Sequence, residues 1–153
     1  MLAKTAQLWA FGALKVPLIF FLRPRVVELS PERAALRIRL SRRSRNQAGS
    51  MYFGALMSGA DIVPGMLAVT LGRKLHRAVS FVFKDCEAHF LRRASGDVTF
   101  VCEDGRSIEQ AILASAGSQV RQDVQAKVKA LAGPEERQAQ VAGFTLTLSV
   151  KAV

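Results

Sequence analysis

The segment from Met51 to Gly72 limits how this chain can fold more than any other. Its sequence, MYFGALMSGADIVPGMLAVTLG, contains a single charged residue, Asp61. A helix that is apolar on all sides has to be buried on most of them. Residues 51–72 therefore predict a central helix that other elements surround. Pro64 removes one backbone donor, so we expect it to bend this helix or to mark the meeting point of two helical pieces.

The same segment is long enough to span a bilayer, which takes about 20 apolar residues. Its glycines, proline and acid weaken that interpretation, and half-buried strand patterns flank it on both sides. Six strand patterns occur in the chain, at 25–29, 36–40, 78–92, 98–102, 120–130 and 142–151. We expect a hairpin turn at 30–33, a bulge near Lys84 and a short helix over 106–116, capped by Asp104 and stopped by Gly117.

These patterns favour one domain over residues 1–153, of the α+β class, in which a curled antiparallel sheet buries the central helix. Half of the 153 residues are hydrophobic, which is enough for one ordinary core. The two cysteines, Cys86 and Cys102, form no disulfide framework and are expected to be small buried residues in a reducing compartment. Cysteine and histidine spacing suggests no metal site, and we expect no cofactor.

The first 22 residues, MLAKTAQLWAFGALKVPLIFFL, form a second apolar region. Lys15 and Pro17 interrupt it, so neither piece spans a bilayer, and no signal-peptide cleavage pattern follows Phe21. We expect an N-terminal helix over part of 1–22 that docks on the domain and ends near Pro17, followed by a short apolar extension. Contact with a membrane surface stays open as an alternative.

The chain carries a net charge of +10, which suits a polyanion, a membrane surface or a ligand that bears phosphates. The basic residues cluster at 37–45, 73–77 and 92–93. A solvated basic face without a specific ligand explains any single cluster equally well. Few aromatic residues accompany the arginines, so stacking platforms for nucleic-acid bases are poorly supplied and we expect no nucleic-acid partner.

The loop before the central helix has a distinctive spacing. Residues 46–54 read NQAGSMYFG, and Asp61 follows nine residues after Tyr52. Together with a sheet wrapped around a long helix, this resembles the hotdog fold. Within that superfamily it resembles acyl-CoA thioesterases of the phenylacetate-pathway type, which carry Asn-x-x-Gly-x-x-His-Gly-Gly and an acid nine residues after the histidine. Tyr52 replaces the histidine here and Phe53 the first glycine. The pattern is also similar to a less characterised thioesterase branch of the superfamily.

The resemblance implies hydrolysis of an acyl-CoA or acyl-carrier thioester by a homodimer or homotetramer with paired interface sites. Asp61 would be the general base or nucleophile, and an amide of Phe53 or Gly54 would polarise the thioester carbonyl. About 10 Å of helix separate Gly54 from Asp61. One carbonyl therefore reaches both only if Asp61 comes from a neighbouring subunit. Asn46 would orient the water or the thioester, or else cap the loop.

Other residues are candidates for holding the substrate, and their sequence context leaves alternatives open. Tyr52, Phe53 and Ser58 lie close to the implied site, although Ser58 is as well explained by a bond to its own helix. The phosphates of CoA require basic residues. These are assigned to Arg73, Lys74 and Arg77, with the cluster before the helix, Arg42, Arg43 and Arg45, as the alternative.

Three functions therefore remain in competition at this level. The first is a cytoplasmic thioesterase, and the second is a non-catalytic acyl-CoA or fatty-acyl binding protein of the same fold. The third is a basic protein that binds nucleic acid or a membrane surface. Replacement of the family histidine by Tyr52 favours the second function, and the net charge favours the third.

Overall fold

The computed structural model describes residues 1–153, except for the side chain of Glu135. Its helices are α1 Leu2–Lys15, α2 Pro17–Leu22, α3 Phe53–Lys74, α4 Gly105–Ser118 and the short η1 Glu135–Arg137. Its strands are β1 Arg25–Leu29, β2 Ala34–Ile38, β3 Val79–Phe90, β4 Val98–Cys102, β5 Gln122–Ala132 and β6 Ala139–Ala152.

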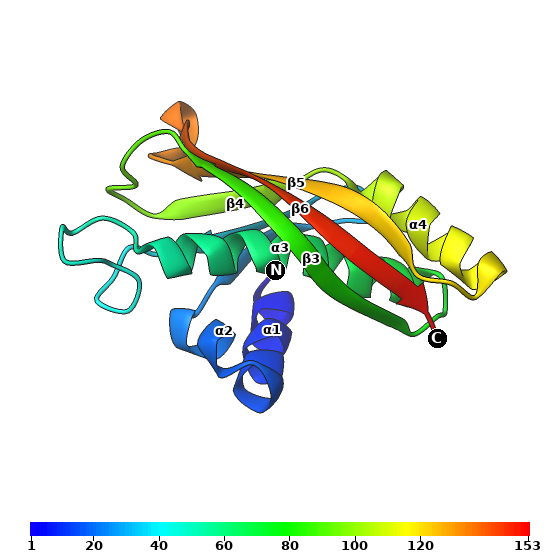
Figure 1. Ribbon diagram of the computed structural model, residues 1–153. Coiled ribbons are helices and arrows are strands. Elements are labelled where there is room, and N and C mark those ends of the chain that lie inside the picture. The colour runs from blue at the N-terminus through cyan, green and yellow to red at the C-terminus, as the bar shows by residue number, and fades with distance from the viewer.

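The strands form one antiparallel sheet in the order β1-β2-β4-β5-β6-β3. The sheet curls over α3, while α1 and α2 lie on the other side of that helix (Figure 1). This is the hotdog architecture that the sequence predicted, with the expected extra N-terminal helix. Strands β1 and β3 occupy the two edges of the sheet, and β3 is a long edge strand of 12 residues.

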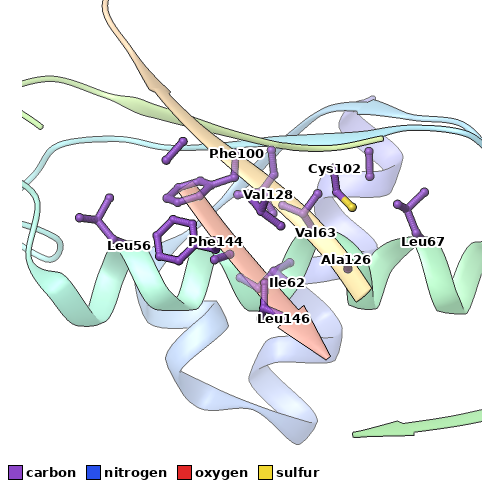
Figure 2. Packing of buried hydrophobic residues seen from close by; sticks show 14 of the residues in the cluster. Leu56, Ile62, Val63, Leu67, Phe100, Cys102, Ala126, Val128, Phe144 and Leu146 are labelled. Carbon is purple, nitrogen blue, oxygen red and sulfur yellow. The ribbon is translucent and has the colours of Figure 1, made fainter. Parts of the chain in front are cut away.

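Helix α3 is central because its small and apolar residues face the sheet. Leu56, Val63 and Leu67 point toward the strands and belong to the same buried cluster as Phe100 (Figure 2). The closest approach is at Gly59, where an added Cβ would lie 2.3 Å from the Phe100 ring. Glycine therefore allows the helix to rest directly on β4, and this contact fixes the depth of α3 in the fold.

By length and composition α3 also resembles a membrane-spanning helix. Its most apolar window has a mean hydropathy of 1.4, but 61% of that window is buried inside the folded chain. The helix thus serves as the core of the domain. It continues as one element across Pro64, so the idea that two helical pieces meet there is wrong.

The N-terminal region forms the predicted helix that ends before Pro17, and the short apolar extension after it folds as a second helix, which was not predicted. Two side chains attach α1 to the start of β1. Thr5 Oγ1 accepts a hydrogen bond from the N–H of Val26 (3.0 Å), and Trp9 Nε1 donates to the carbonyl of Pro24 (2.7 Å). The two short helices pack closely at Gly12, where a Cβ would lie 2.7 Å from the backbone nitrogen of Phe20.

Helix α4 forms where a helix was predicted and buries Ile108, Ile112 and Ser115 against the sheet. Its predicted ends are wrong. Asp104 occupies the cap position, but its carboxylate accepts a hydrogen bond from the N–H of Lys127 (2.6 Å) and does not cap the helix. The helix also continues through Gly117 and ends at Ser118, and the C-cap residue Gln119 takes the left-handed conformation.

Two further expectations needed correction, and one detail is confirmed. Strand β2 covers 34–38 and not 36–40, because the chain leaves the sheet where the N–H of Leu40 donates to Asp97 (2.9 Å). Cys102 is buried as expected, whereas Cys86 is exposed because β3 is an edge strand. The register of β3 shifts between Phe83 and Asp85, which confirms the bulge.

Candidate functional site

Asp61 lies in the middle of α3 on the face turned away from β4. Its side chain is exposed in the single chain, but its surroundings are largely apolar, and this partial burial raises the pKa of the Asp61 carboxyl above its ordinary value. Among the described residues no donor binds the carboxylate and no cation pairs with it. A desolvated carboxylate without a structural partner is typical of a functional acid or base.

Two cavities meet at Asp61. The smaller, of about 370 Å³, lies between α3 and the strands β3 and β6, and its walls include Met57, Phe83, Cys86 and Leu146. The larger, of about 630 Å³, runs between α3, the N-terminal helices and the start of β3. We call the first the edge cleft, because it opens beside the edge strand, and the second the helix groove.

The helix groove has mainly apolar walls with cations at two places. Phe11 of α1, Ile19 of α2 and Phe81 of β3 face Met66 and Val69 of α3. Lys4 and Arg73 also border the groove. Asp61 and Arg73 are 12 residues apart, which is roughly 18 Å along the helix axis. The groove can thus hold an elongated ligand that ends in a negatively charged group.

The N-terminus of α3 presents free backbone donors. Tyr52 is the N-cap residue, and its carbonyl accepts from the N–H groups of Ala55 and Leu56. Within the described chain the N–H groups of Phe53 and Gly54 donate to no protein acceptor. The first N–H groups of a helix have no partner inside it and carry the positive end of its dipole. They are therefore suited to bind an oxygen that gains negative charge.

The side chains of Tyr52 and Phe53 surround these donors and are both more than half exposed. The ring of Tyr52 lies over Gly54, where an added Cβ would be 2.6 Å from the ring. Phe53 packs on Phe90 at the end of β3, with ring centroids 5.5 Å apart. Gly54 thus gives room to the Tyr52 ring, and Phe53 connects the helix start to the edge strand.

Asn46 organises the loop that precedes α3. Its Oδ1 accepts hydrogen bonds from the N–H groups of Ala48 (3.0 Å) and Ser50 (3.1 Å), and its Nδ2 donates to the hydroxyl of Ser50 (3.0 Å). This is the capping role that the sequence left open for Asn46. Gly49 in the same loop takes a positive φ of 77°, which glycine adopts without strain.

The remaining predicted residues separate into two groups. Ser58 borders the edge cleft, but its hydroxyl donates to the carbonyl of Gly54 (2.7 Å) inside its own helix. Of the three basic residues after the helix, Arg73 alone borders the helix groove. Lys74 binds Glu109 of α4 at 2.8 Å, and Arg77 is exposed beyond the helix end.

Sequence reasoning missed most of the walls of the two cavities. Phe11, Phe81 and Phe83 border the cavities, but they come from elements to which the sequence assigned no part in the site. Phe81 and Phe83 are two residues apart in a strand and therefore share one face of it, and that face borders the site. The contribution of α1 carried no such signal, because a docking helix reveals no partner surface in its own sequence.

The raised pKa of Asp61 predicts how stability depends on pH. Since the folded chain favours the protonated carboxyl, the charged form weakens the fold at any pH above the raised pKa, and this cost disappears below the unfolded pKa of about 3.9. We expect Asp61→Asn to have a slightly higher Tm than the parent at pH 7, and this difference to vanish near pH 3.5. Thermal unfolding across this pH range checks the sign, and a lower Tm for the variant at pH 7 would contradict it.

Solved structures share this fold over nearly the whole chain. A protein of unknown function from Pseudomonas aeruginosa, described as a probable thioesterase, has 23% identity and a TM-score of 0.79, covering 97% of this chain and 96% of its own. A thioesterase family protein from Silicibacter pomeroyi has 19% identity and a TM-score of 0.71, covering 97% and 99%. A protein of unknown function from Chlorobaculum tepidum has 11% identity and a TM-score of 0.82, covering 96% and 93%.

At these identities the likeness establishes the fold. A comparison with curated proteins gives no match. The sequence itself matches a family model over residues 4–150. The chain therefore belongs to the family described as Domain of unknown function (DUF4442).

Proposed function

We propose that this protein hydrolyses an acyl-CoA or acyl-carrier thioester with Asp61 as the general base. The observation that supports this is the position of Asp61, whose unpaired, partly desolvated carboxylate lies where the edge cleft and the helix groove meet. A base with a raised pKa accepts a proton from water more readily than an ordinary aspartate. The naming of two structural neighbours as thioesterases fits this chemistry.

The working unit in this proposal is a homodimer, with a homotetramer as a further level of assembly. Within one chain, about 10 Å of helix separate the free amide of Gly54 from Asp61, which is too far for one carbonyl. The outer edge of β3 has unpaired backbone groups that a second copy can pair with. Two copies joined along β3 would close the edge cleft, so that the helix start of one subunit faces Asp61 of the other.

The proposed reaction uses few groups. The N–H groups of Phe53 and Gly54 bind the thioester oxygen, and Asp61 of the partner subunit takes a proton from water as the water oxygen bonds to the carbonyl carbon. Collapse of the tetrahedral intermediate breaks the C–S bond, and the departing sulfur receives the proton from Asp61. A carboxylic acid and a thiol leave. Asn46 contributes by holding the loop that fixes the helix start.

The two cavities suggest where each half of the substrate lies. Arg73 and Lys4 border the helix groove, so this groove suits the pantetheine arm of CoA, with its phosphates at the cations. The apolar walls of the edge cleft, from Met57, Phe83 and Leu146, suit the acyl group. Tyr52, Phe53 and Ser58 then surround the thioester, while Lys74 and Arg77 serve as more distant positive charges.

The role of Arg73 can be separated from that of its neighbour. We expect Arg73→Ala to raise KM for acyl-CoA about tenfold with little change in kcat, since it removes a charge-assisted contact that ground state and transition state share. Lys74→Ala is the matched control, because Lys74 is occupied by Glu109. Hydrolysis of the same acyl group on N-acetylcysteamine, which lacks phosphates, should be equal in all three proteins. An unchanged KM for Arg73→Ala would place the phosphates elsewhere.

A panel of acyl-CoA substrates in a thiol-release assay tests the proposed function as a whole. The proposal predicts release of free thiol that saturates with substrate. The second candidate, a non-catalytic acyl-CoA binding protein, predicts saturable binding without thiol release. Its support is the exposed pair Tyr52 and Phe53, which replaces the histidine and glycine of the family pattern beside the helix start.

We infer that the protein works in the cytoplasm. Cys86 is an exposed free thiol and Cys102 a buried one. An exposed thiol persists best in a reducing compartment. The proposed reaction requires CoA or acyl-carrier thioesters in that compartment. It requires no cofactor.

A further inference from the structure

The corner between α1 and α2 exposes a group of apolar side chains, of which only Val16 also borders the helix groove. Every residue from Ala13 to Leu18 is exposed. Leu14 is 80% exposed, Leu18 54% and Phe21 51%. We define the corner patch by its exposed large side chains, which are Leu14, Val16, Leu18, Phe20 and Phe21. Contiguous exposed apolar surface of this kind marks an interaction site more often than chance exposure does.

Positive charge surrounds the corner patch. The guanidinium of Arg43 lies 5.8 Å from the Phe21 ring centroid, that of Arg23 lies 5.7 Å from the Phe20 ring centroid, and Lys15 is inside the corner itself. Within the described chain none of these three cations forms a salt bridge, and of the two nearby acids, Glu28 and Glu32, the first pairs with Arg33. Residues 1–27 carry four basic residues and residues 33–60 carry six, with no Asp or Glu in either stretch.

We propose that the corner patch docks this protein on the surface of an anionic lipid bilayer. Apolar side chains of a short helical corner can enter the headgroup region while neighbouring cations face lipid phosphates. The pairing of exposed leucine and phenylalanine with unbalanced arginine and lysine matches that surface in both polarity and charge. The proposal is independent of the reaction proposed above and adds a location to it.

Two other occupants fit the structure less well. Nucleic acid would need free aromatic faces for stacking, but Arg23 lies over Trp9 and Phe20, and Arg43 lies over Phe21. A second copy of the chain is already assigned to the β3 edge in the proposed dimer. Helix α1 is bound to β1, which is the opposite edge of the sheet. The proposed dimer therefore leaves the corner patch uncovered, and a further copy on the patch is an outcome that the test below detects.

Cosedimentation of the full chain with vesicles tests the proposal. We expect binding to vesicles of phosphatidylcholine with phosphatidylglycerol, and little binding to phosphatidylcholine alone or at high salt. The double variant Leu18→Ser/Phe21→Ser should bind about tenfold more weakly. The matched control is Leu113→Ser/Val120→Ser, which changes two equally exposed apolar residues far along the sequence and should bind as the parent does. Arg23→Gln/Arg43→Gln should lose the preference for anionic lipid.

Several outcomes would overturn the proposal. These are no binding to anionic vesicles, equal loss in the control variant, or binding to duplex DNA without binding to vesicles. A change of oligomeric state in Leu18→Ser/Phe21→Ser would mean that a second copy covers the patch. Thermal unfolding shows whether each variant folds. Thiol release from a soluble short-chain thioester should be equal in the parent and Leu18→Ser/Phe21→Ser, so that failure of docking and failure of the proposed reaction are distinguishable.

Discussion

Asp61→Asn is expected to lower kcat for thioester hydrolysis by about 10²–10⁴-fold, which is the usual loss when a general base is removed. The amide keeps the shape of the carboxyl but cannot take a proton from water. KM should change little, because substrate contacts come from the cavity walls. Thiol release measured at saturating acyl-CoA, with circular dichroism to show that the variant folds, checks this result.

The matched control is Asp85→Asn in the same edge cleft, where the carboxylate accepts a hydrogen bond from Thr147 (2.7 Å). It should keep kcat within about threefold of the parent. The parent should also lose activity as pH falls through the pKa of Asp61, which burial raises above its ordinary value. An Asp61→Asn variant with parental kcat would remove Asp61 from the mechanism.

Phe100→Ala is expected to lower the free energy of unfolding by about 3–5 kcal/mol, the usual cost of removing a large buried ring. Phe100 belongs to β4 and has no exposed surface, and its ring lies against Gly59 of the central helix. Its loss leaves a cavity directly under α3. Urea unfolding followed by circular dichroism measures the change. Leu113→Ala, at an exposed position of α4, is the control and should stay within about 0.5 kcal/mol.

Gly59→Ala provides a second view of the same contact. In the parent, Gly59→Ala forces a methyl group against the Phe100 ring, and we expect it to lower the free energy of unfolding by about 1–3 kcal/mol. In the Phe100→Ala background the methyl group has space, so the same change should cost much less. Strictly additive effects in this double-mutant cycle would show that helix and strand do not press on each other here.

The sequence predicted the fold because its strongest signals come from burial. A helix that is apolar on all sides has one simple solution among half-buried strands, and α3 with its curled sheet is that solution. The turn-forming residues at 30–33 predicted the hairpin between β1 and β2, and the irregular alternation of polar and apolar residues near Lys84 predicted the bulge in β3. Both signals reflect local backbone geometry. Errors lie at element ends. Asp104 has the sequence context of an N-terminal cap and Gly117 that of a helix stop. The Asp104 carboxylate instead accepts a hydrogen bond from Lys127 of β5, and the helix continues past Gly117.

The candidate site could be predicted only in part. Asp61 is conspicuous because no other charge lies in its segment, and the loop of Asn46 has a recognisable spacing. Edge position, however, depends on strand order, so the exposure of Cys86 could not be read from its strand pattern. Arg73 and Lys74 are neighbours in sequence, yet they point to the helix groove and to Glu109 respectively. Successive side chains leave a helix in different directions, and the sequence does not show which of the two directions faces the groove.

The shared site is the central claim, and two inactive variants can test it together. Phe53→Pro removes one free donor at the start of α3, a position that tolerates proline, and Tyr52 already has a φ of −65° and a ψ of 143°, which suit a residue before proline. Phe53→Ala is the control that removes the ring but keeps the N–H, and it should remain more active than Phe53→Pro.

The decisive measurement is thiol release after Asp61→Asn and Phe53→Pro subunits are dissociated, mixed and allowed to reassociate. A mixed dimer contains one complete site, built from the helix start of the first subunit and Asp61 of the second. Random pairing therefore predicts recovery of about one quarter of parental activity. If the mixture stays as inactive as its two components while mixed dimers form, the site does not span two subunits, and the proposed mechanism is wrong.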